Sequence, residues 1–231
     1  MRRFYKIVSI ARDAEDFDIR LDEKPLRTPA RNPLRLPTTA LAEAVAAEWD
    51  RQGEKIAPAG MHLTQLVYTA RDRVAPDRAA VVDAAVGYAE TDLLCYRAEH
   101  PQSLVERQHR AWQPLLDWCA VAYDAPLAVT KGIAPVAQPE DSIASLRRAV
   151  EAQDDLRLIA LQTATSLLGS LVLALALLDR RIGWEEAMAA STLDEDFQIE
   201  RWGEDAEAAK RRASLKEELA AIDDFIARLE G

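Results

Sequence analysis

Residues 158–178 read LIALQTATSLLGSLVLALALL, a tract of 21 residues without a charged side chain. About 20 apolar residues can cross a bilayer, so the length alone leaves a membrane span open. Small and polar residues dilute the tract: Gln162, Thr163, Thr165, Ser166, Gly169 and Ser170. The tract is single, and no Trp or Tyr belt flanks it. We therefore predict a buried central helix of a soluble domain, within a helix over residues 156–179.

Around this tract, the chain after about residue 78 has the periodicity of helices. Apolar residues recur three or four positions apart in two stretches: Val82, Val86, Ala89 and Leu93, then Trp112, Leu115, Leu116 and Cys119. Ser103 and Glu106 form a capping box for the second helix, and Pro114 predicts a kink or a restart within it. The elements expected next are a loop over 124–141, a helix over 142–154 and, after Gly183, a helix with Trp184, Met188 and Phe197.

The last helix carries apolar residues that alternate four and three apart: Leu215, Leu219, Ile222, Ile226 and Leu229. This is a heptad seam of about two heptads. A dimeric coiled coil needs three or more, so the pattern favours a helix that docks on its own domain. We expect a monomer.

The first 37 residues have the period of two that is typical of strands. One set of residues, Phe4, Lys6, Val8 and Ile10, alternates with a second set, Tyr5, Ile7 and Ser9. Apolar residues alternate with polar ones from Phe17 to Leu21, and residues 22–25 have turn chemistry. From Thr38 the period becomes helical, with a cap at Thr38 or Thr39 and an end at Gly53. We predict an α+β protein, with a small antiparallel sheet domain and covering helix over residues 1–75 and a larger all-α domain over 76–231.

The charge balance excludes some partners. Against 29 basic side chains stand 39 acidic ones, a net charge of -10, which repels phosphate backbones and anionic lipids. We expect no nucleic acid partner and no stable membrane insertion. The two cysteines, Cys95 and Cys119, lie in apolar helical contexts, and the N-terminus does not resemble a secretory or import signal. These features favour a cytoplasmic protein.

A search for catalytic motifs is negative. The sequence has no phosphate-binding glycine loop, HExxH, CxxC or GxSxG motif. Three histidines could in principle join the cysteines around zinc, but the spacings of His62, Cys95, His100, His109 and Cys119 match no structural zinc pattern. We predict no metal, no cofactor and no catalytic residue.

Residues 193–207 read LDEDFQIERWGEDAE and combine seven carboxylates with one arginine. Such acidic runs are usually solvated helix faces, but large aromatic residues among them are typical of surfaces that bind a partner. The candidate partner-binding residues are Glu195, Phe197, Glu200, Trp202, Glu204 and Glu207. A second group is either structural or partner-binding: Glu48, Trp49 and Asp50. Trp49 lies on the apolar stripe of its helix, which favours a core position.

Five strings, in order along nearly the whole chain, resemble the assembly chaperone family for the alpha subunit of F-type ATP synthase. They are FYK at 4–6, LRTPARNPL at 26–34, EWD at 48–50, TDLLCYR at 91–97 and FQIERWG at 197–203. The resemblance implies a small α+β domain joined to a helical domain. It implies a protein that binds the free alpha subunit, hides the surface that alpha later presents to beta, and releases it when beta arrives, without hydrolysing ATP.

The resemblance also assigns residues. Trp49 matches the tryptophan of the family's Glu-Trp-Asp string, and Glu200, Trp202 and Glu204 match a C-terminal tract implicated in function. Glu204 and Glu207 are both candidates for one family glutamate. Two other classes of function stay open: a small-molecule enzyme with an unrecognised acidic site, which needs a deep pocket with a perturbed pKa, and a peripheral membrane protein.

Overall fold

The computed structural model describes residues 1–231, apart from the side chain of Asp13. The chain divides into two compact units. The first comprises Met1–Arg78, Asp154–Ala160 and Ala221–Gly231, and the second comprises Ala79–Gln153 and Leu161–Ala220. A small antiparallel sheet precedes a mostly helical chain, which confirms the predicted α+β class. The division after residue 75 stays a prediction.

Three strands form the sheet: β1 (Val8–Asp13), β2 (Asp16–Leu21) and β3 (Lys24–Pro25), in the order β1-β2-β3. Neighbouring strands are antiparallel, and Ile10 lies opposite Ile19. The strand alternation predicted from Phe4 begins only at Val8. Before it, the backbone N–H groups of Lys6 and Ile7 donate to the Asp22 carboxylate, at 2.9 Å each, in place of a longer ladder.

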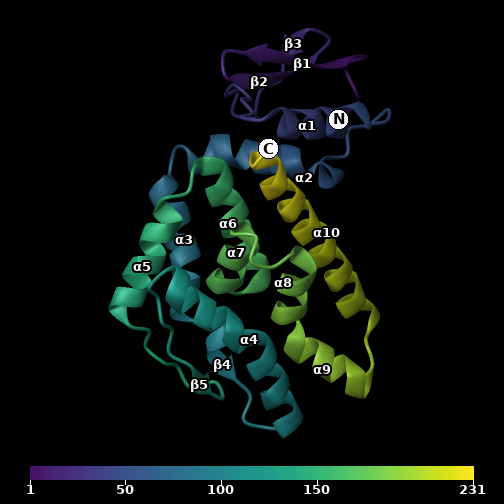
Figure 1. The fold of residues 1–231 in the computed structure, drawn as a ribbon. Helices are drawn as coiled ribbons and strands as arrows, with labels where there is room; N and C mark the ends of the chain where they lie inside the picture. The colour runs from purple at the N-terminus through teal and green to yellow at the C-terminus, as the bar shows by residue number, and fades with distance from the viewer. The chain divides into compact units, whose positions relative to one another are not determined.

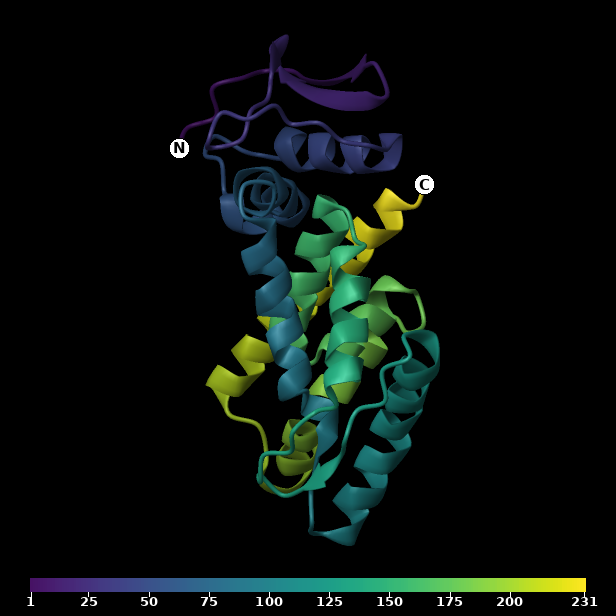
Figure 2. The same cartoon turned by 90° about the vertical axis from the view of Figure 1, so that its left-hand side faces the viewer.

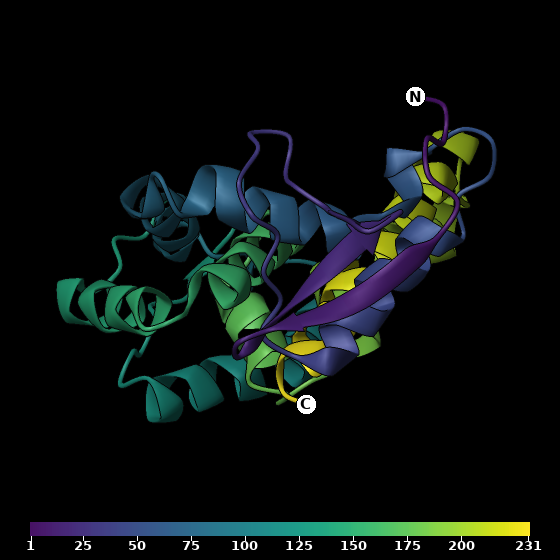
Figure 3. The same ribbon diagram turned by 90° about the horizontal axis from the view of Figure 1, so that it is seen from above.

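Helix α1 (Thr39–Asp50) lies along one face of this sheet (Figures 1 and 3). The predicted cap is confirmed, since Thr38 Oγ1 accepts a hydrogen bond from the Leu41 N–H at 3.2 Å. The helix ends at Asp50, before the predicted end at Gly53. The residues on its apolar stripe are buried: Leu41, Val45 and Trp49. Burial of each large side chain stabilises the fold by roughly 1.5–3 kcal/mol.

Helix α2 (His62–Thr69) packs on α1, on the side away from the sheet (Figure 2). It follows a short turn, η1 (Pro58–Gly60), and continues as a π-helical segment, η2 (Ala70–Val74). The Asp72 carboxylate in η2 accepts hydrogen bonds from Thr28 Oγ1 at 2.6 Å and from Ala30 N at 2.9 Å. It thereby holds the proline-rich loop that follows β3.

The remaining chain is mainly helical (Figure 1). Its helices are α3 (Arg78–Glu90), η3 (Leu93–Cys95), α4 (Gln102–Ala122), α5 (Glu140–Glu151), α6 (Asp155–Leu168), α7 (Leu171–Leu178), α8 (Trp184–Ser191), α9 (Leu193–Trp202) and α10 (Ala206–Leu229). Within the expected loop over 124–141, β5 (Thr130–Lys131) pairs in parallel with β4 (Tyr96–Arg97), which the sequence did not predict. The α10 seam is buried at Leu219, Ile222 and Ile226.

The uncharged tract forms two helices, α6 and α7, so the prediction of one helix over residues 156–179 is wrong. Gly169 has a φ of +66°, which ends α6, and Ser170 Oγ caps α7 by accepting from Leu173 N at 3.0 Å. The buried Asp92 carboxylate reinforces this start, since it accepts from Ser170 Oγ at 2.7 Å and Val172 N at 3.1 Å. Within the described residues, no helix is long and apolar enough to cross a membrane.

Three further predictions about helix ends are corrected. The single helix expected after Gly183 breaks at Thr192, which separates α8 from α9 and whose hydroxyl bonds to Met188 and Asp196. Helix α4 begins at Gln102 after Pro101, so Ser103 lies inside the first turn and the predicted capping box is wrong. The helix then runs unbroken through Pro114, without the restart that the proline suggested.

Candidate functional site

The acidic tract of residues 193–207 forms α9 and the turn into α10. Asp194, Glu195 and Asp196 occupy the first turn of α9, where the positive end of the helix dipole favours carboxylates. Gly203, with a φ of +83°, ends the helix directly after Trp202. The Asp205 carboxylate then caps α10 by accepting from Glu207 N at 2.9 Å and Ala208 N at 2.8 Å. Glu207 itself is exposed.

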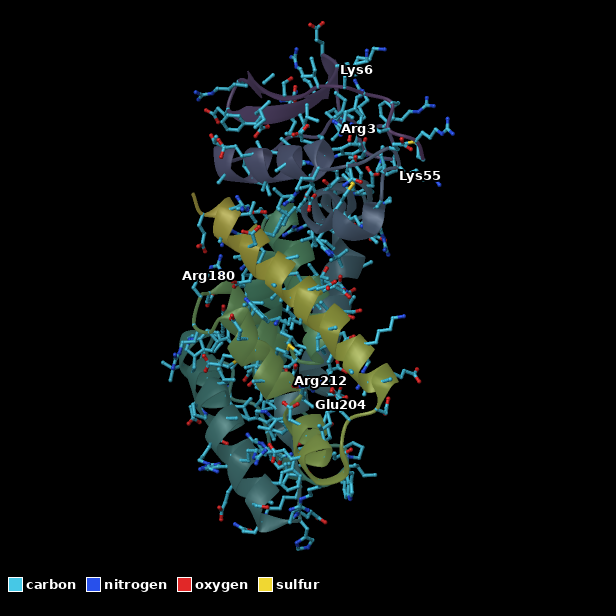
Figure 4. All side chains as sticks on the ribbon, turned by 90° about the vertical axis from the view of Figure 1, so that its right-hand side faces the viewer. Arg3, Lys6, Lys55, Arg180, Glu204 and Arg212 are labelled. Atoms are coloured by element: carbon cyan, nitrogen blue, oxygen red, sulfur yellow. The ribbon has the colours of Figure 1, made fainter. Side chains whose placement is uncertain are left out.

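Arginines from α10 hold several of the carboxylates in place. Arg212 contacts Asp196 at 2.6 Å and Glu204 at 3.3 Å, and Glu195 at 3.8 Å. Figure 4 shows the side chains of Arg212 and Glu204 close together. Arg211 forms a further ion pair with Glu195. The tract is therefore not a bare negative surface but one with counter-charges built into the neighbouring helix.

Arg107 of α4 pairs with the other end of α9. Its guanidinium donates to both carboxylate oxygens of Glu200, at 2.7 and 3.0 Å. These hydrogen bonds lower the pKa of Glu200 and raise the pKa of Arg107. Glu200 is therefore ionised at neutral pH, which makes it a poor general acid.

Phe197 is buried, and two guanidinium groups lie close to its ring. The Cζ of Arg201 is 4.1 Å from the centre of its ring, and that of Arg107 is 5.3 Å away. Cation–π geometry of this kind fixes both arginines over the ring. The structure thus gives Phe197 a core position, with its ring covered by the arginines that organise the acidic surface.

Trp202 has the opposite environment. Its side chain is 77% exposed at the last turn of α9. In the sequence it lies two residues after Glu200 and two before Glu204, which pair with Arg107 and Arg212. A large exposed indole costs solvation free energy unless a partner covers it, and tryptophan is enriched among the residues that dominate protein interfaces. The predicted residues that lie on the outer surface are Glu200, Trp202, Glu204 and Glu207.

Hollows flank α9 on two sides. A cavity of about 380 Å³ lies between α4, α8 and α9 and includes Arg107, Asp196 and Glu200 in its wall. A larger cavity of about 680 Å³ includes Glu195, Arg211 and Arg212. Both volumes are in the range of ligand pockets, but three of the carboxylates in their walls, Glu195, Asp196 and Glu200, pair with arginines.

The second predicted group, Glu48, Trp49 and Asp50, forms the end of α1, and each residue has a different environment. The buried Glu48 carboxylate accepts from Leu63 N at 2.9 Å and from Thr64 N at 2.8 Å, and so caps α2. Trp49 is buried edge-on against Tyr5, whose hydroxyl donates to the Trp49 carbonyl at 2.6 Å. Asp50 is exposed and pairs with Arg3 at 3.5 Å.

The histidines and cysteines do not come together. Cys95 and Cys119 are free and buried, and burial raises the pKa of both thiols to about 12, which keeps them unreactive. Among the described side chains, no group of three or more His, Cys, Asp or Glu could hold a metal ion.

Sequence reasoning missed the arginines. Arg211 and Arg212 follow the acidic tract closely. Opposite charges three or four residues apart on a helix lie next to each other, so this spacing is a signal that could have predicted ion pairs. Arg107 carries no such local signal, because α4 lies far from α9 in the sequence. Only the fold brings its guanidinium to Glu200.

The fold and this surface define a class: an α+β protein with an exposed tryptophan set among held carboxylates, features typical of protein-binding surfaces. Comparison with known proteins gives the family. The model of the ATP12 chaperone protein family matches residues 2–120. The chain belongs to this family, the chaperones of ATP synthase assembly, which confirms the resemblance seen in the sequence.

Relatives match nearly the whole chain. The crystal structure of Atp12 from Paracoccus denitrificans has 42% sequence identity and a TM-score of 0.94, and the match covers 99% of this chain and 98% of that one. A mutant of the same Paracoccus denitrificans protein gives the same identity and TM-score, with 99% and 97% covered. The mitochondrial protein atp12 of Schizosaccharomyces pombe is 25% identical over 234 residues, which is 95% of this chain and 80% of that protein.

Proposed function

We propose that this protein binds the free alpha subunit of F-type ATP synthase and masks its beta-facing surface until the beta subunit displaces it. Within a chaperone family, the observation that carries the proposal is the exposed Trp202 at the end of α9, set between Glu200 and Glu204. The protein acts by binding, without catalysis, as a monomer in the cytoplasm.

The chemistry of the surface suits a partner that must later be released. An unassembled subunit exposes apolar surface that drives association with wrong partners. The Trp202 indole offers it an apolar anchor, while charges at the rim affect the association rate and the salt dependence more than the final affinity. Rim contacts of this kind allow exchange with a competitor.

The predicted residues then divide into two roles. Glu200, Trp202, Glu204 and Glu207 are proposed to contact the client, because they are exposed. Glu195 and the buried Phe197 are proposed to position this surface through Arg211, Arg107 and Arg201. In the group at Glu48, Trp49 and Asp50, only Asp50 is exposed; we assign the group a structural role.

Co-expression with the alpha subunit of the same organism, without beta, tests the proposal. We expect alpha to remain soluble only in the presence of this protein and to elute with it in size-exclusion chromatography. Addition of beta should displace it. Alpha that aggregates regardless, or that elutes alone, contradicts the proposal.

Charge reversal tests whether the acidic tract is the surface that binds alpha. Lysine substitution of Glu200, Glu204 and Glu207 together should abolish capture of alpha and leave the far-UV spectrum and the melting temperature near those of the wild type, since all three are exposed. The matched control is lysine substitution of Glu90, Glu99 and Glu217, which are also exposed and give the same change in net charge. Equal losses of alpha capture in both triple variants would mean that the overall charge causes the effect. The acidic tract would then not be the binding site.

A further inference from the structure

Helix α4 contacts both sides of the break between α8 and α9 through two buried side chains. Trp112 Nε1 donates to the Ala190 carbonyl in the last turn of α8 at 2.8 Å. Gln108 Nε2 donates to Asp194 Oδ1 in the first turn of α9 at 2.7 Å. Gln108 is 1% exposed, and Trp112 is fully buried. The two donors are four residues apart on one face of α4, so they hold the chain on either side of Thr192.

The Gln108 amide has a fixed orientation. Its Oε1 accepts from the Ala98 N–H at 2.8 Å, which leaves the Nε2 group as the donor toward α9. The Gln108 backbone carbonyl accepts from Arg97 Nη1 at 3.1 Å, and the Arg97 guanidinium lies 5.3 Å from the centre of the Trp112 ring. Arg97, the last residue of the string at 91–97, therefore supports both α4 side chains that contact the break.

A second link between α4 and α9 lies at the surface. It is the ion pair of Arg107 with Glu200, whose side chains are 38% and 56% exposed. Exposed ion pairs contribute little, because water and salt screen them. A buried amide that donates to a carboxylate is costlier to break, since its N–H group is then left without a partner. The hydrogen bond from Gln108 to Asp194 is therefore the contact that fixes the direction of α9.

A change in that direction is largest at the far end of α9. Trp202 follows Asp194 by eight residues, which is about 12 Å along a helix that rises 1.5 Å per residue. A tilt of about 20° around the first turn moves the last turn by roughly 4 Å, which is the whole range of an apolar contact. Glu200 lies in the same part of the helix and moves with Trp202.

We propose that Gln108 is a positioning residue for the capture of alpha: its hydrogen bond to Asp194 directs α9 so that Trp202 and Glu200 meet the client together. Gln108 is buried and acts through Asp194, without touching the client itself. This inference rests on the proposed function and names the residue that positions its binding surface.

Substitutions of the acceptor test this role and leave Gln108 in place. Asp194→Asn keeps an oxygen that accepts from Gln108 Nε2, whereas Asp194→Leu has a similar size and no acceptor. Both remove the same charge from the start of α9. We expect Asp194→Asn to capture alpha within about twofold of the wild type and Asp194→Leu to capture it about fivefold or more less. Equal capture by the two variants overturns the inference and leaves the proposed function standing.

A control in α5 separates positioning from a general loss of stability. Ser142 is also 1% exposed, and its hydroxyl donates to the Pro126 carbonyl at 2.7 Å. Ser142→Ala removes this hydrogen bond and changes no residue of α4 or α9. All variants are compared well below their melting temperatures. Ser142→Ala should capture alpha like the wild type, and a loss equal to that of Asp194→Leu overturns the inference.

Hydrogen exchange of the free protein gives a second readout. In Asp194→Leu, we expect faster exchange than in Asp194→Asn in a peptide that covers residues 195–203, and equal exchange in a peptide that covers α7. Unchanged exchange of α9 in Asp194→Leu overturns the inference. If Asp194→Leu does not fold, Asp194→Ala replaces it in both measurements. A wild-type protein that captures no alpha at all overturns the proposed function and this inference with it.

Discussion

Two short segments of this protein pair a glutamate with a tryptophan and give them opposite environments. In α1, Glu48 and Trp49 are buried, and the carboxylate caps α2 through Leu63 and Thr64. In α9, Glu200 and Trp202 are exposed, and the carboxylate binds the Arg107 side chain. The residue types are the same in the two segments. The Glu48 carboxylate, however, accepts from backbone N–H groups, whereas the Glu200 carboxylate accepts from a long side chain at the surface.

The difference shows how a carboxylate acquires its role. A buried carboxylate with fixed backbone donors cannot leave without exposing unpaired N–H groups, so its loss destabilises the fold. A carboxylate paired with an exposed arginine exchanges easily with water or with a partner, so its loss changes the surface and little else. Four predictions test this contrast, in order of the expected effect on stability.

Replacement of each tryptophan by arginine should separate the two segments most strongly. Trp49→Arg places a charge at a buried position against Tyr5 and should cost several kcal/mol, enough to unfold or aggregate the protein. Trp202→Arg at the exposed position should leave the melting temperature near that of the wild type. Thermal unfolding of the soluble fractions measures both. A folded, stable Trp49→Arg protein that fails to capture alpha would assign Trp49 to the interface.

Asp92 extends the contrast to a carboxylate that is fully buried without an arginine partner. Burial raises its pKa from 3.8 to about 6, although hydrogen bonds from Ser170 and Val172 oppose the shift. Since the folded pKa lies above the unfolded value, this group stabilises the fold most below about pH 4, and that contribution is lost as the pH rises through 6.

Asp92→Asn removes this titration. The stability of the wild type relative to the variant should therefore fall by roughly 2 to 3 kcal/mol between pH 4 and pH 7. Urea unfolding of both proteins at several pH values measures the difference, and the common response of all other carboxylates cancels. A difference that is constant with pH would mean that Asp92 does not change its charge in this range.

The periodicity of the sequence predicted the element types better than their ends. The alternation around Phe17 to Leu21 and the stripe through Leu41 and Val45 are local, and both gave the correct strand and helix. The break at Gly169 and Ser170 was missed because the hydrophobic pattern continues across it. What stabilises that break is Asp92, a residue distant in sequence whose carboxylate holds the start of α7.

The candidate site shows the same contrast between local patterns, which the sequence reveals, and long-range contacts, which it does not. The composition of residues 193–207 marked the tract, but the sequence did not decide between a core and an exposed position for Trp202, which the structure shows to be exposed. The contact of the Phe197 ring with Arg107 could not be predicted, since Arg107 comes from α4, which is distant in the sequence. Long-range pairs of this kind have no periodic signal and arise only when the chain folds.

Glu48→Gln tests the buried partner of the first pair. The amide keeps the shape of the side chain but places an NH₂ group against N–H donors of Leu63 or Thr64, which leaves buried donors facing each other. The expected loss is about 1–3 kcal/mol of unfolding free energy. Urea unfolding at neutral pH measures it, and Thr64→Val, which removes only the hydroxyl that donates to the same carboxylate at 2.6 Å, should lose less. An unchanged free energy of unfolding for Glu48→Gln would show that Glu48 does not stabilise α2 as a cap.

Glu200→Gln applies the identical substitution to the exposed pair and should have the smallest effect on stability. The amide oxygen can still accept one hydrogen bond from Arg107, and the guanidinium remains over the Phe197 ring. We expect the melting temperature to change by less than about 2 °C, because exposed ion pairs contribute little and salt screens them. Capture of alpha should instead become slower and less sensitive to salt, since a rim charge that steers association has been removed. A large drop in melting temperature with unchanged association kinetics would mean that Glu200 serves the fold as Glu48 does, and the contrast between the two segments would be wrong.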